Sequence, residues 1–347
     1  MAIGVGILGG TGYGAGELLR LCALHPNIDV VSVTSREAGK ICDAHPHLNG
    51  FYSDLFDTEV NVGALSSYDQ AVIFSALPHG VSGQTIINLL EETDSDTFKV
   101  IDLSGDWRLK SLELHSEFYP KSPIAAELRK KFQYGLTELY RDEISSCSLL
   151  ANPGCLATAS ALAAAPIGSL DPIGQIAVDA KTGSTGSGKE PKSTTHHPTR
   201  HGNFRGYKPL AHQHEPEFKQ AIAPSYTNQL PPMSFLAQSL PIARGIFVSV
   251  HAQLENEITS QALIEHLEKF YSTSPFIRVL HELPEIGPVV GTNFCDISGA
   301  ARGNQIIICA AIDNLGKGMA SAAIQNMNLM FGLEETTGLM QPALGPC

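Results

Sequence analysis

The chain has 347 residues, of which 43% are hydrophobic, and it carries 23 Lys and Arg against 35 Asp and Glu, a net charge of −12. This composition is typical of a globular protein with an ample core and argues against a largely disordered chain. Because a single core stops growing at about 250–300 residues, the length favours two domains. The acidic balance argues against a protein whose whole surface binds nucleic acid or anionic membrane.

The amino-terminal segment has neither a charged leader nor a membrane span. No Lys or Arg precedes Arg20, and no apolar stretch approaches the ~20 residues that a span needs. We therefore expect a cytoplasmic protein. Its seven cysteines form no C-x-x-C pair, and an odd number favours reduced thiols over a disulfide framework.

Short apolar runs and helix-like segments alternate in the first part of the chain. The runs cover residues 3–8, 30–34, 71–76, 100–103 and 149–151. Runs of this kind are typical of strands buried on both faces, as in parallel sheets. Helical patterns at 15–24 and 83–92 separate them. Residues 1–154 are therefore predicted to form a doubly wound α/β domain with a parallel sheet.

The pattern changes after Cys155. An Ala-rich helix is predicted at 156–165, and alternating runs at 234–240, 245–254 and 305–313 predict a mixed, largely antiparallel sheet. An amphipathic helix is predicted at 259–271 and an apolar one at 319–331. We expect residues 155–316 to form a second, α+β domain for catalysis and dimerisation, and 317–347 to complete the first domain.

A glycine-rich segment, residues 9–16, follows the first predicted strand and opens a helix. Glycines let the backbone turn tightly and approach a pyrophosphate, and the helix start offers N–H donors. After the second strand the chain has Ser35 and Arg36 instead of an acidic residue. A guanidinium there suits a 2′-phosphate, which indicates NADP, although Arg36 as a solvated surface charge is the alternative. The segment 75–80 would lie at the same sheet edge.

Cys155 follows a predicted strand and directly precedes the predicted helix 156–165, which places the thiol at a helix start. A helix start favours the thiolate and could hold an oxyanion with its N–H groups, so Cys155 is the candidate nucleophile. The alternative is a small buried residue, which is the fate of most free cysteines.

A base for this nucleophile is sought in segment 212–217. His212 and His214, two apart in an extended segment, would point the same way, and Glu217 could orient an imidazole. A zinc site built with His196 and His197 is the rival interpretation, but ligand spacing is missing and no metal is predicted.

The longest irregular piece is predicted at 181–208. It holds six Lys and Arg against one acidic residue, Glu190, and it contains Phe204 and Tyr207. Loops longer than about 12–15 residues are usually functional or disordered, and the aromatic residues favour a function.

Six motifs occur in a fixed order over nearly the whole chain. They are GGTGYGAGELLRL from residue 9, ALPHG from 76, DLSGDWRL from 102, ANPGCLATA from 151, GYKPLAHQHEPE from 206 and IDNLGKG from 312. In this combination the sequence resembles the N-acetyl-gamma-glutamyl-phosphate reductase family of arginine biosynthesis. The resemblance implies a Rossmann-type domain with a semialdehyde-dehydrogenase-like α+β domain, and an activity that uses NADPH to reduce an acyl phosphate to an aldehyde.

The resemblance also implies roles for matching positions. Cys155 matches the nucleophile and His212 the acid/base. The predicted cofactor contacts are Gly9, Thr11, Gly12, Tyr13, Ser35, Arg36, Ser75, Leu77, Pro78 and Asn314, and the predicted substrate contacts are Arg108, Asn152, Lys189, His197 and Glu217. Among them Asn314 resembles the asparagine that orients nicotinamide, and Arg108 sits where related reductases place a phosphate-binding arginine.

Two departures from the family pattern leave the substrate open. Leu156-Ala157 replace the usual Tyr-Pro, and STGSGK at 184–189 replaces the usual SGAGR. The loop 189–208 looks closer to the branch that acts on carrier-protein-linked aminoadipyl or glutamyl phosphates. We therefore expect a small acyl phosphate, free or presented on an acidic carrier protein, and a homo-oligomer without nucleic acid or membrane partners. An alternative of another class is a non-catalytic NADP-binding sensor or scaffold.

Overall fold

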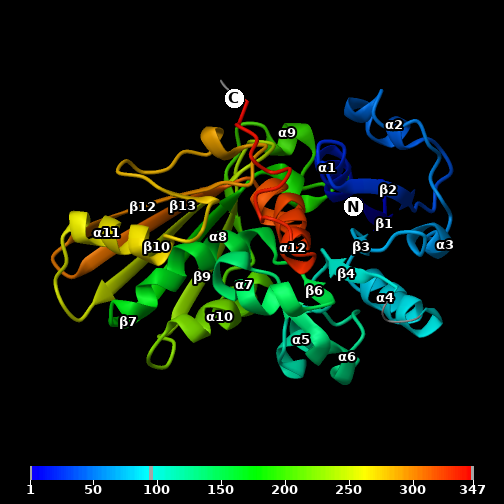
Figure 1. Ribbon diagram of the computed structural model, residues 1–347. Coiled ribbons are helices and arrows are strands. Elements are labelled where there is room, and N and C mark those ends of the chain that lie inside the picture. The colour runs from blue at the N-terminus through cyan, green and yellow to red at the C-terminus, as the bar shows by residue number, and fades with distance from the viewer. Residues whose placement is uncertain (1, 94–96, 345–347) are drawn as a thin grey trace. The chain divides into compact units, whose positions relative to one another are not determined.

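The computed structural model describes residues 2–93 and 97–344, and it divides into two compact units (Figure 1). The first unit runs to Pro153 and includes Met319–Met340, and the second comprises Gly154–Gly318 with the tail from Gln341. The tail from Gln341 thus groups with the second unit, whereas the sequence analysis placed all of 317–347 in the first. Residues 345–347 of that expected segment lie outside the described residues.

The first unit contains a six-stranded sheet in which every pair of neighbours is parallel. Its order is β2-β1-β3-β4-β6-β5. The strands are β1 Ile3–Leu8, β2 Ile28–Val33, β3 Ala71–Ser75, β4 Lys99–Asp102, β5 Phe132–Tyr134 and β6 Leu149–Ala151. The predicted doubly wound parallel sheet is confirmed. The sequence analysis missed β5, a three-residue edge strand too short to show a pattern.

Helices flank this sheet in the first unit. They are α1 Tyr13–Cys22, α2 Ile41–Ala44, η1 Pro46–Leu48, α3 Val62–Leu65, α4 Val81–Glu92, α5 Leu112–Phe118, α6 Ala126–Lys131, α7 Thr137–Ser146 and α12 Ser321–Met330. Helix α12, the last in the chain, packs against α1 and α7 and thus belongs to the first unit. Below the sheet's central strands, Trp107 stacks on Phe132 with ring centroids 4.6 Å apart, inside a cluster that includes Ile73 and Val100.

The second unit contains a seven-stranded mixed sheet in the order β11-β12-β13-β10-β7-β9-β8. The strands are β7 Pro172–Thr182, β8 Arg205–Tyr207, β9 Met233–Ser239, β10 Ile246–Leu254, β11 Ile277–Val279, β12 Cys295–Arg302 and β13 Gln305–Ile312. The pairs β11 with β12 and β7 with β9 are parallel, and the other pairs are antiparallel. The predicted mixed sheet is confirmed, but the sequence analysis missed β7, β8, β11 and β12.

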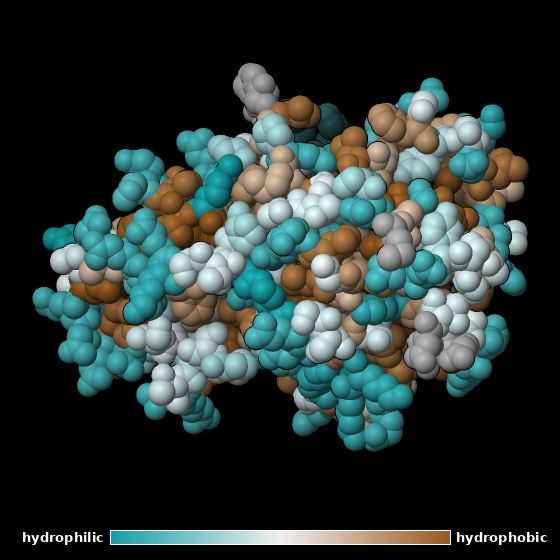
Figure 2. All heavy atoms as spheres, in the orientation of Figure 1, coloured by the Kyte–Doolittle hydropathy of each residue, from teal (hydrophilic) through white to brown (hydrophobic). Residues whose placement is uncertain are grey.

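Helices and short helical turns accompany this sheet in the second unit. They are α8 Cys155–Ala164, η2 Ala165–Ser169, η3 Ser184–Ser187, α9 His197–Arg200, α10 His214–Ile222, η4 Ala223–Ser225, α11 Ser260–Phe270, η5 Gly287–Val289 and the π-turn η6 Gly316–Ala320. Helix α8 packs on β10 and β13, and α11 packs on β12. Leu263 and Leu267 face inward from α11, and Figure 2 shows hydrophilic side chains over its outer face.

The segment 181–208 is not wholly irregular, contrary to expectation. It opens with the end of β7 and contains η3, α9 and the edge strand β8. Within the described ranges 2–93 and 97–344, no helix has the length and apolar composition needed to cross a membrane.

Candidate active site

The glycine-rich turn joins β1 to α1 and leaves little room for side chains. Gly9 has a φ of +81°, which favours glycine. A Cβ on Gly10 would lie 2.5 Å from Val33 and 2.7 Å from Phe56, whereas a Cβ on Gly12 would meet nothing within 4 Å. The turn is therefore packed on its inner side and open at Gly12, the residue that precedes α1. An open, glycine-lined helix start fits a dinucleotide pyrophosphate.

Thr34 at the end of β2 holds this turn. Its carbonyl oxygen accepts the Gly10 N–H at 2.7 Å, and its hydroxyl accepts the Gly9 N–H at 3.3 Å. Ser35, half-buried, and Arg36, exposed, follow directly. The Ser35 hydroxyl accepts the Glu37 N–H at 3.0 Å. This placement fits the predicted 2′-phosphate contact, because an exposed guanidinium adjoins the residue that anchors the phosphate turn.

The segment after β3 lies beside the same turn. A Cβ on Gly9 would come within 2.9 Å of the Leu77 side chain, so Leu77 packs against the turn. Ser75 is buried, and its hydroxyl shares a 2.6 Å hydrogen bond with Ser82. Pro78 is exposed. Of the three predicted contacts, Ser75 thus has a structural partner, while Leu77 and Pro78 line the accessible side.

Two buried carboxylates that the sequence analysis did not single out fix this segment. Asp106 accepts the N–H groups of Gly80 at 2.9 Å and Gly83 at 2.7 Å, so it occupies the start of α4. Asp102 accepts from the hydroxyls of Ser82 and Ser104 at 2.5 and 2.6 Å. Burial raises the Asp102 pKa to about 6, against the lowering effect of these hydrogen bonds. The two carboxylates of the DLSGD motif therefore hold the segment after β3 in place by hydrogen bonds.

Arg108 and Asn152 contact one another instead of facing an open space. Arg108 is 4% exposed, and its guanidinium donates to the carbonyl oxygens of Asn152 at 2.8 Å and Leu103 at 2.7 Å. The Asn152 amide donates to the Met319 carbonyl and accepts from Asn326. Both predicted substrate contacts are thus engaged with the protein, and they position the segment that leads to Cys155.

Cys155 lies at a helix start as expected, but it is itself the first residue of α8, one residue earlier than predicted, and Gly154 is the N-cap. The thiol is partly exposed. A Cβ on Gly318 would lie 2.7 Å from the Cys155 Cβ, so a glycine is needed for the π-turn to pass this close. The helix start gives the sulfur a positive dipole end and backbone N–H groups.

Glu217, on α10, reaches the same helix start. Its Oε1 accepts the Gly154 N–H at 2.6 Å, and the side chain is fully buried. The sequence analysis expected this carboxylate to orient an imidazole. In the structure this carboxylate accepts the backbone N–H of the residue immediately before the nucleophile, which is one donor of the helix start.

His212 and His214 are not in an extended segment, contrary to expectation, because His214 begins α10. Their rings lie 4.8 Å apart at 69°, and the His214 N–H donates to His212 Nδ1 at 3.1 Å. Neutral His212 therefore carries its hydrogen on Nε2. Burial, with a smaller contribution from Lys208, lowers the His212 pKa to about 4.

Tyr207 connects the two predicted catalytic residues. Its ring lies 5.5 Å from the His212 ring, and its phenol interacts electrostatically with Cys155. Burial, and then the Cys155 charge, raise the Tyr207 pKa. The sequence analysis noted Tyr207 only as an aromatic residue of the loop. Its place beside both Cys155 and His212 depends on the pairing of edge strand β8 with β9, which no local pattern reveals.

Asn314 follows β13 and is 2% exposed. Its oxygen accepts the Gly245 N–H at 2.8 Å and its nitrogen donates to the Thr185 hydroxyl at 2.8 Å. The preceding Asp313 accepts from Leu315 and Arg244, which fixes the turn that passes Cys155. The Asn314 amide thus connects η3 to the residue before β10 by these two hydrogen bonds.

Lys189 and His197 lie in the exposed part of the 189–208 segment. The His197 ring stacks on His201 at 5.2 Å. Arg200 anchors this segment by donating to the Ser239 hydroxyl and the Leu240 carbonyl. The contacts described above join Cys155, Tyr207, His212 and Glu217, and they do not include Lys189 or His197.

No set of three His, Cys, Asp or Glu side chains suited to a metal ion is present in the part of the chain that the structure describes.

Family models match both units. The semialdehyde dehydrogenase NAD binding domain matches residues 4–147, and the semialdehyde dehydrogenase dimerisation domain matches residues 155–314. Among solved structures, aspartate semialdehyde dehydrogenase II of Vibrio cholerae has a TM-score of 0.67 at 14% identity, covering 96% of this chain and 99% of that one. The enzyme from Francisella tularensis has a TM-score of 0.62 at 13% identity, with 95% and 100% covered. At such low identity, these similarities show the fold.

Curated relatives match over their full length. The N-acetyl-gamma-glutamyl-phosphate reductase of Methanocaldococcus jannaschii is 40% identical over 350 residues, 99% of each chain. That of Archaeoglobus fulgidus is 39% identical, again over 99% of each chain. The chain therefore belongs to the N-acetyl-gamma-glutamyl-phosphate reductase family, with a semialdehyde dehydrogenase NAD-binding domain followed by a dimerisation domain of the same type.

Proposed function

We propose that this protein reduces N-acetyl-gamma-glutamyl phosphate with NADPH, giving N-acetylglutamate 5-semialdehyde and phosphate, a step of arginine biosynthesis. The observation that carries the proposal is the Cys155 thiol at the start of α8, which interacts electrostatically with Tyr207 and follows the Gly154 N–H that Glu217 accepts. Full-length relatives at 40% identity carry the name of this reaction.

The first chemical step belongs to Cys155. Its thiolate attacks the acyl carbon, a C–S bond forms, and the bond to the phosphate oxygen breaks, so phosphate leaves with the electron pair. Backbone N–H groups at the start of α8 stabilise the oxyanion of the tetrahedral intermediate. The product of this step is a thioester on Cys155.

Reduction of the thioester requires a hydride and a donor that stabilises the oxyanion formed by its addition. Bound NADPH supplies the hydride. His212 is neutral at pH 7 because its pKa is about 4, and its Nε2 carries the hydrogen. Nε2–H therefore donates a hydrogen bond to the substrate oxygen that becomes negative when the hydride arrives, and the nitrogen keeps its proton. The C–S bond then breaks, its electrons return to sulfur, and the aldehyde is released.

The residues that would hold the cofactor are those of the β1–α1 turn. Gly9, Thr11, Gly12 and Tyr13 provide the glycine-lined helix start for the pyrophosphate, and Arg36 provides a cation for the 2′-phosphate. Asn314 supports the cofactor indirectly in this proposal, because both ends of its amide engage Thr185 and Gly245.

The test of the nucleophile is Cys155→Ser. We expect NADPH oxidation to fall by about 10³-fold or more, with NADPH binding unchanged by fluorescence titration. Mass spectrometry of the quenched wild-type enzyme should show the acyl adduct on Cys155. The matched control is Cys309→Ser, which changes a buried thiol of the same unit. Unchanged turnover in Cys155→Ser would remove the nucleophile, and no turnover by the wild type would favour the sensor or scaffold.

A carrier-linked aminoadipyl or glutamyl phosphate is the second candidate substrate, and one surface favours it. Lys189, Lys192, Arg205 and Lys208 are exposed together with Phe204 and Leu210, the last two 54% and 67% exposed. A basic surface with exposed apolar groups suits an acidic protein partner. Comparing kcat/KM for N-acetylglutamyl phosphate with that for a carrier-linked acyl phosphate, in wild type and Arg205→Glu, distinguishes the two. Only the carrier reaction should depend on Arg205.

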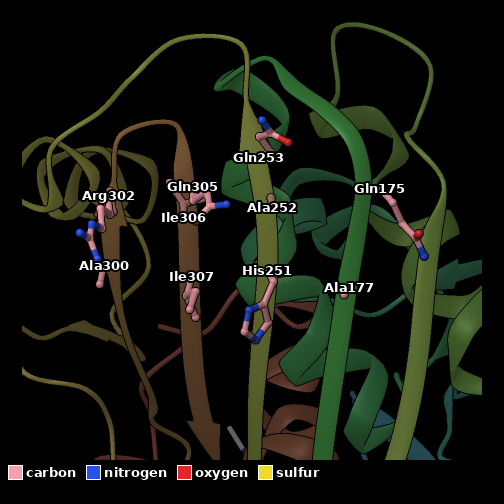
Figure 3. A pocket seen from close by; sticks show the side chains of 11 residues that line it. Gln175, Ala177, His251, Ala252, Gln253, Ala300, Arg302, Gln305, Ile306 and Ile307 are labelled. Atoms are coloured by element: carbon pink, nitrogen blue, oxygen red, sulfur yellow. The ribbon is translucent and has the colours of Figure 1, made fainter.

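We propose a homodimer formed by the uncovered face of the second sheet. Figure 3 shows Ala177, His251 and Ile307 on neighbouring strands of this face, and the strand register pairs His251 with both of the others. The face has a shallow hollow of about 430 Å³, and the covering helices lie on the opposite face. Ala177→Arg should reduce the mass in sedimentation equilibrium to that of a monomer. Ala262→Arg, on the exposed face of α11, should not; the reverse result would place the interface elsewhere.

A further inference from the structure

His45 is a buried histidine that neither the motifs nor the mechanism uses. It lies between α2 and η1, and its side chain is 4% exposed. Its own segment holds its backbone, since the His45 N–H donates to the Ile41 carbonyl and the His45 carbonyl accepts the Leu48 N–H. The imidazole therefore leaves a fixed backbone and reaches a part of the chain that is 35 residues away in sequence.

The imidazole ends on the glycine turn. His45 Nε2 lies 2.6 Å from the Gly10 carbonyl oxygen. Because a carbonyl can only accept, Nε2 carries the hydrogen and donates it. Gly10 is thus held on both sides, by Thr34 at its N–H and by His45 at its carbonyl. Since a peptide unit is planar and trans, fixing this carbonyl also fixes the direction of the Thr11 N–H, which points the opposite way.

The same ring explains a glycine in the first turns of α1. A Cβ on Gly16 would lie 2.6 Å from His45 Nδ1 and 2.8 Å from its Cε1. Gly16 thus provides the space in which the imidazole lies under the helix. His45 and Gly16 form one packed unit with the start of α1, and a larger residue at position 16 would displace the ring from Gly10.

We propose that His45 is a positioning residue for the nucleotide phosphates. By holding the Gly10 carbonyl, it keeps a partially negative oxygen away from the phosphate side and sets the N–H groups of the turn before the ligand arrives. Preorganisation of this kind increases affinity because the turn need not be ordered upon binding. The proposal rests on the proposed use of NADPH and adds that affinity for the pyrophosphate depends on a side chain outside the turn.

The test compares three nucleotides by direct binding to the purified protein. In His45→Leu, the Kd values for NADPH and for NADH should both rise about tenfold, the equivalent of one buried hydrogen bond. The Kd for 2′-AMP, which lacks the pyrophosphate, should change less than about twofold. His45→Gln, which keeps a donor, should recover most of the loss. Alkylation of Cys155 by iodoacetamide should proceed at the wild-type rate in all these variants.

Controls separate this role from a loss of stability. His25→Leu removes another buried histidine of the same unit, whose Nε2 lies 3.0 Å from Asn328 Oδ1. It should lower the melting temperature without changing the Kd for NADPH. His47→Leu changes the exposed neighbour and should do neither. In a double-mutant cycle, Gly16→Ala should weaken binding in the wild type but have little further effect in His45→Ala.

The outcomes are distinguishable. If the wild type binds NADPH and His45→Leu binds it equally well, the positioning role is overturned and the proposed function stands. A loss restricted to NADPH, with NADH unchanged, would also overturn it, because the turn contacts both. If the wild type binds neither dinucleotide, the proposed cofactor is ruled out, and the proposed role of His45 is ruled out with it.

Discussion

The two predicted binding regions are built in opposite ways. In the first unit, the turn from Gly9 to Gly12 works through backbone, and its inner side excludes even a Cβ at Gly10. In the second unit, Cys155, Tyr207, His212 and Glu217 work through side chains that come from separate segments. The first region depends on the absence of side chains at its glycines, whereas the second depends on side-chain functional groups that the fold brings together.

This difference teaches where each region is vulnerable. A backbone-made site fails when an atom is added to its residues or when a side chain that holds its backbone, such as His45, is removed. A side-chain site tolerates small backbone changes but fails when one functional group is removed. Four substitutions or conditions test this contrast, from the largest expected effect to the smallest.

The largest effect is expected for His212→Asn. Removing the Nε2–H that serves the substrate oxygen should lower kcat by about 10²–10³-fold, while the Kd for NADPH stays within about twofold. Stopped-flow kinetics and fluorescence titration measure the two quantities. A change in NADPH affinity larger than the change in kcat would assign His212 a structural role.

In the first unit, Gly10→Ala should have the next largest effect. The added Cβ would lie 2.5 Å from Val33 and 2.7 Å from Phe56, so the turn must shift. We expect the free energy of unfolding to fall by about 1–3 kcal/mol, as for overpacked sites, and the Kd for NADPH to rise. Gly12→Ala, where a Cβ meets nothing, should leave stability nearly unchanged. Equal destabilisation by both would break the contrast.

Acid should destabilise the second region through His212. Its folded pKa is about 4, below the unfolded value of 6.5, so the unfolded chain binds the proton first as the pH falls. The stability is fully present above pH 6.5 and is lost towards pH 4, amounting to about 2 kcal/mol between pH 7 and pH 5. Urea unfolding at both pH values measures this effect. From pH 7 to pH 5, the free energy of unfolding of the wild type should fall by about 2 kcal/mol more than that of His212→Asn. An identical pH dependence of the two would contradict it.

The smallest effect is expected for Arg36→Ala. Arg36 is exposed and follows the residue that anchors the glycine turn. Its removal should raise the KM for NADPH about tenfold through loss of the 2′-phosphate contact, and that for NADH hardly at all. This truncation sharpens the contrast, because the 2′-phosphate is the part of the cofactor that a side chain would contact directly. Equal effects on both nucleotides would exclude the contact.

The sequence predicts the first region well because its physics is local. A buried strand, a glycine turn and a helix are adjacent in the chain, and residues 9–16 carry the whole pattern. The start of α8 at Cys155 is predictable for the same reason. By contrast, Glu217 on the Gly154 N–H and Tyr207 beside His212 depend on how α10 and β8 pack, over separations that no local spacing encodes.

The missed strands have a related cause. β7 alternates buried Ile176, Val178 and Ala180 with less apolar neighbours. This alternation is typical of a strand, but the Gly and Ala residues of β7 weaken the pattern. β12 ends in Ser, Gly and Ala residues, which have low strand propensity and are placed by pairing with β13 along its whole length. Arg108 was predicted at a phosphate, but its type alone could not show that two carbonyls already occupy it.

Asp106 has a consequence for how an anion chooses its place in the first unit. The starts of α1 and α4 both follow strands of the parallel sheet and would both attract a phosphate. Because Asp106 already caps α4 through Gly80 and Gly83, the protein neutralises one of these two competing sites with its own carboxylate. Of these two helix starts, the start of α1 is therefore the one whose N–H groups are not already engaged by the Asp106 carboxylate.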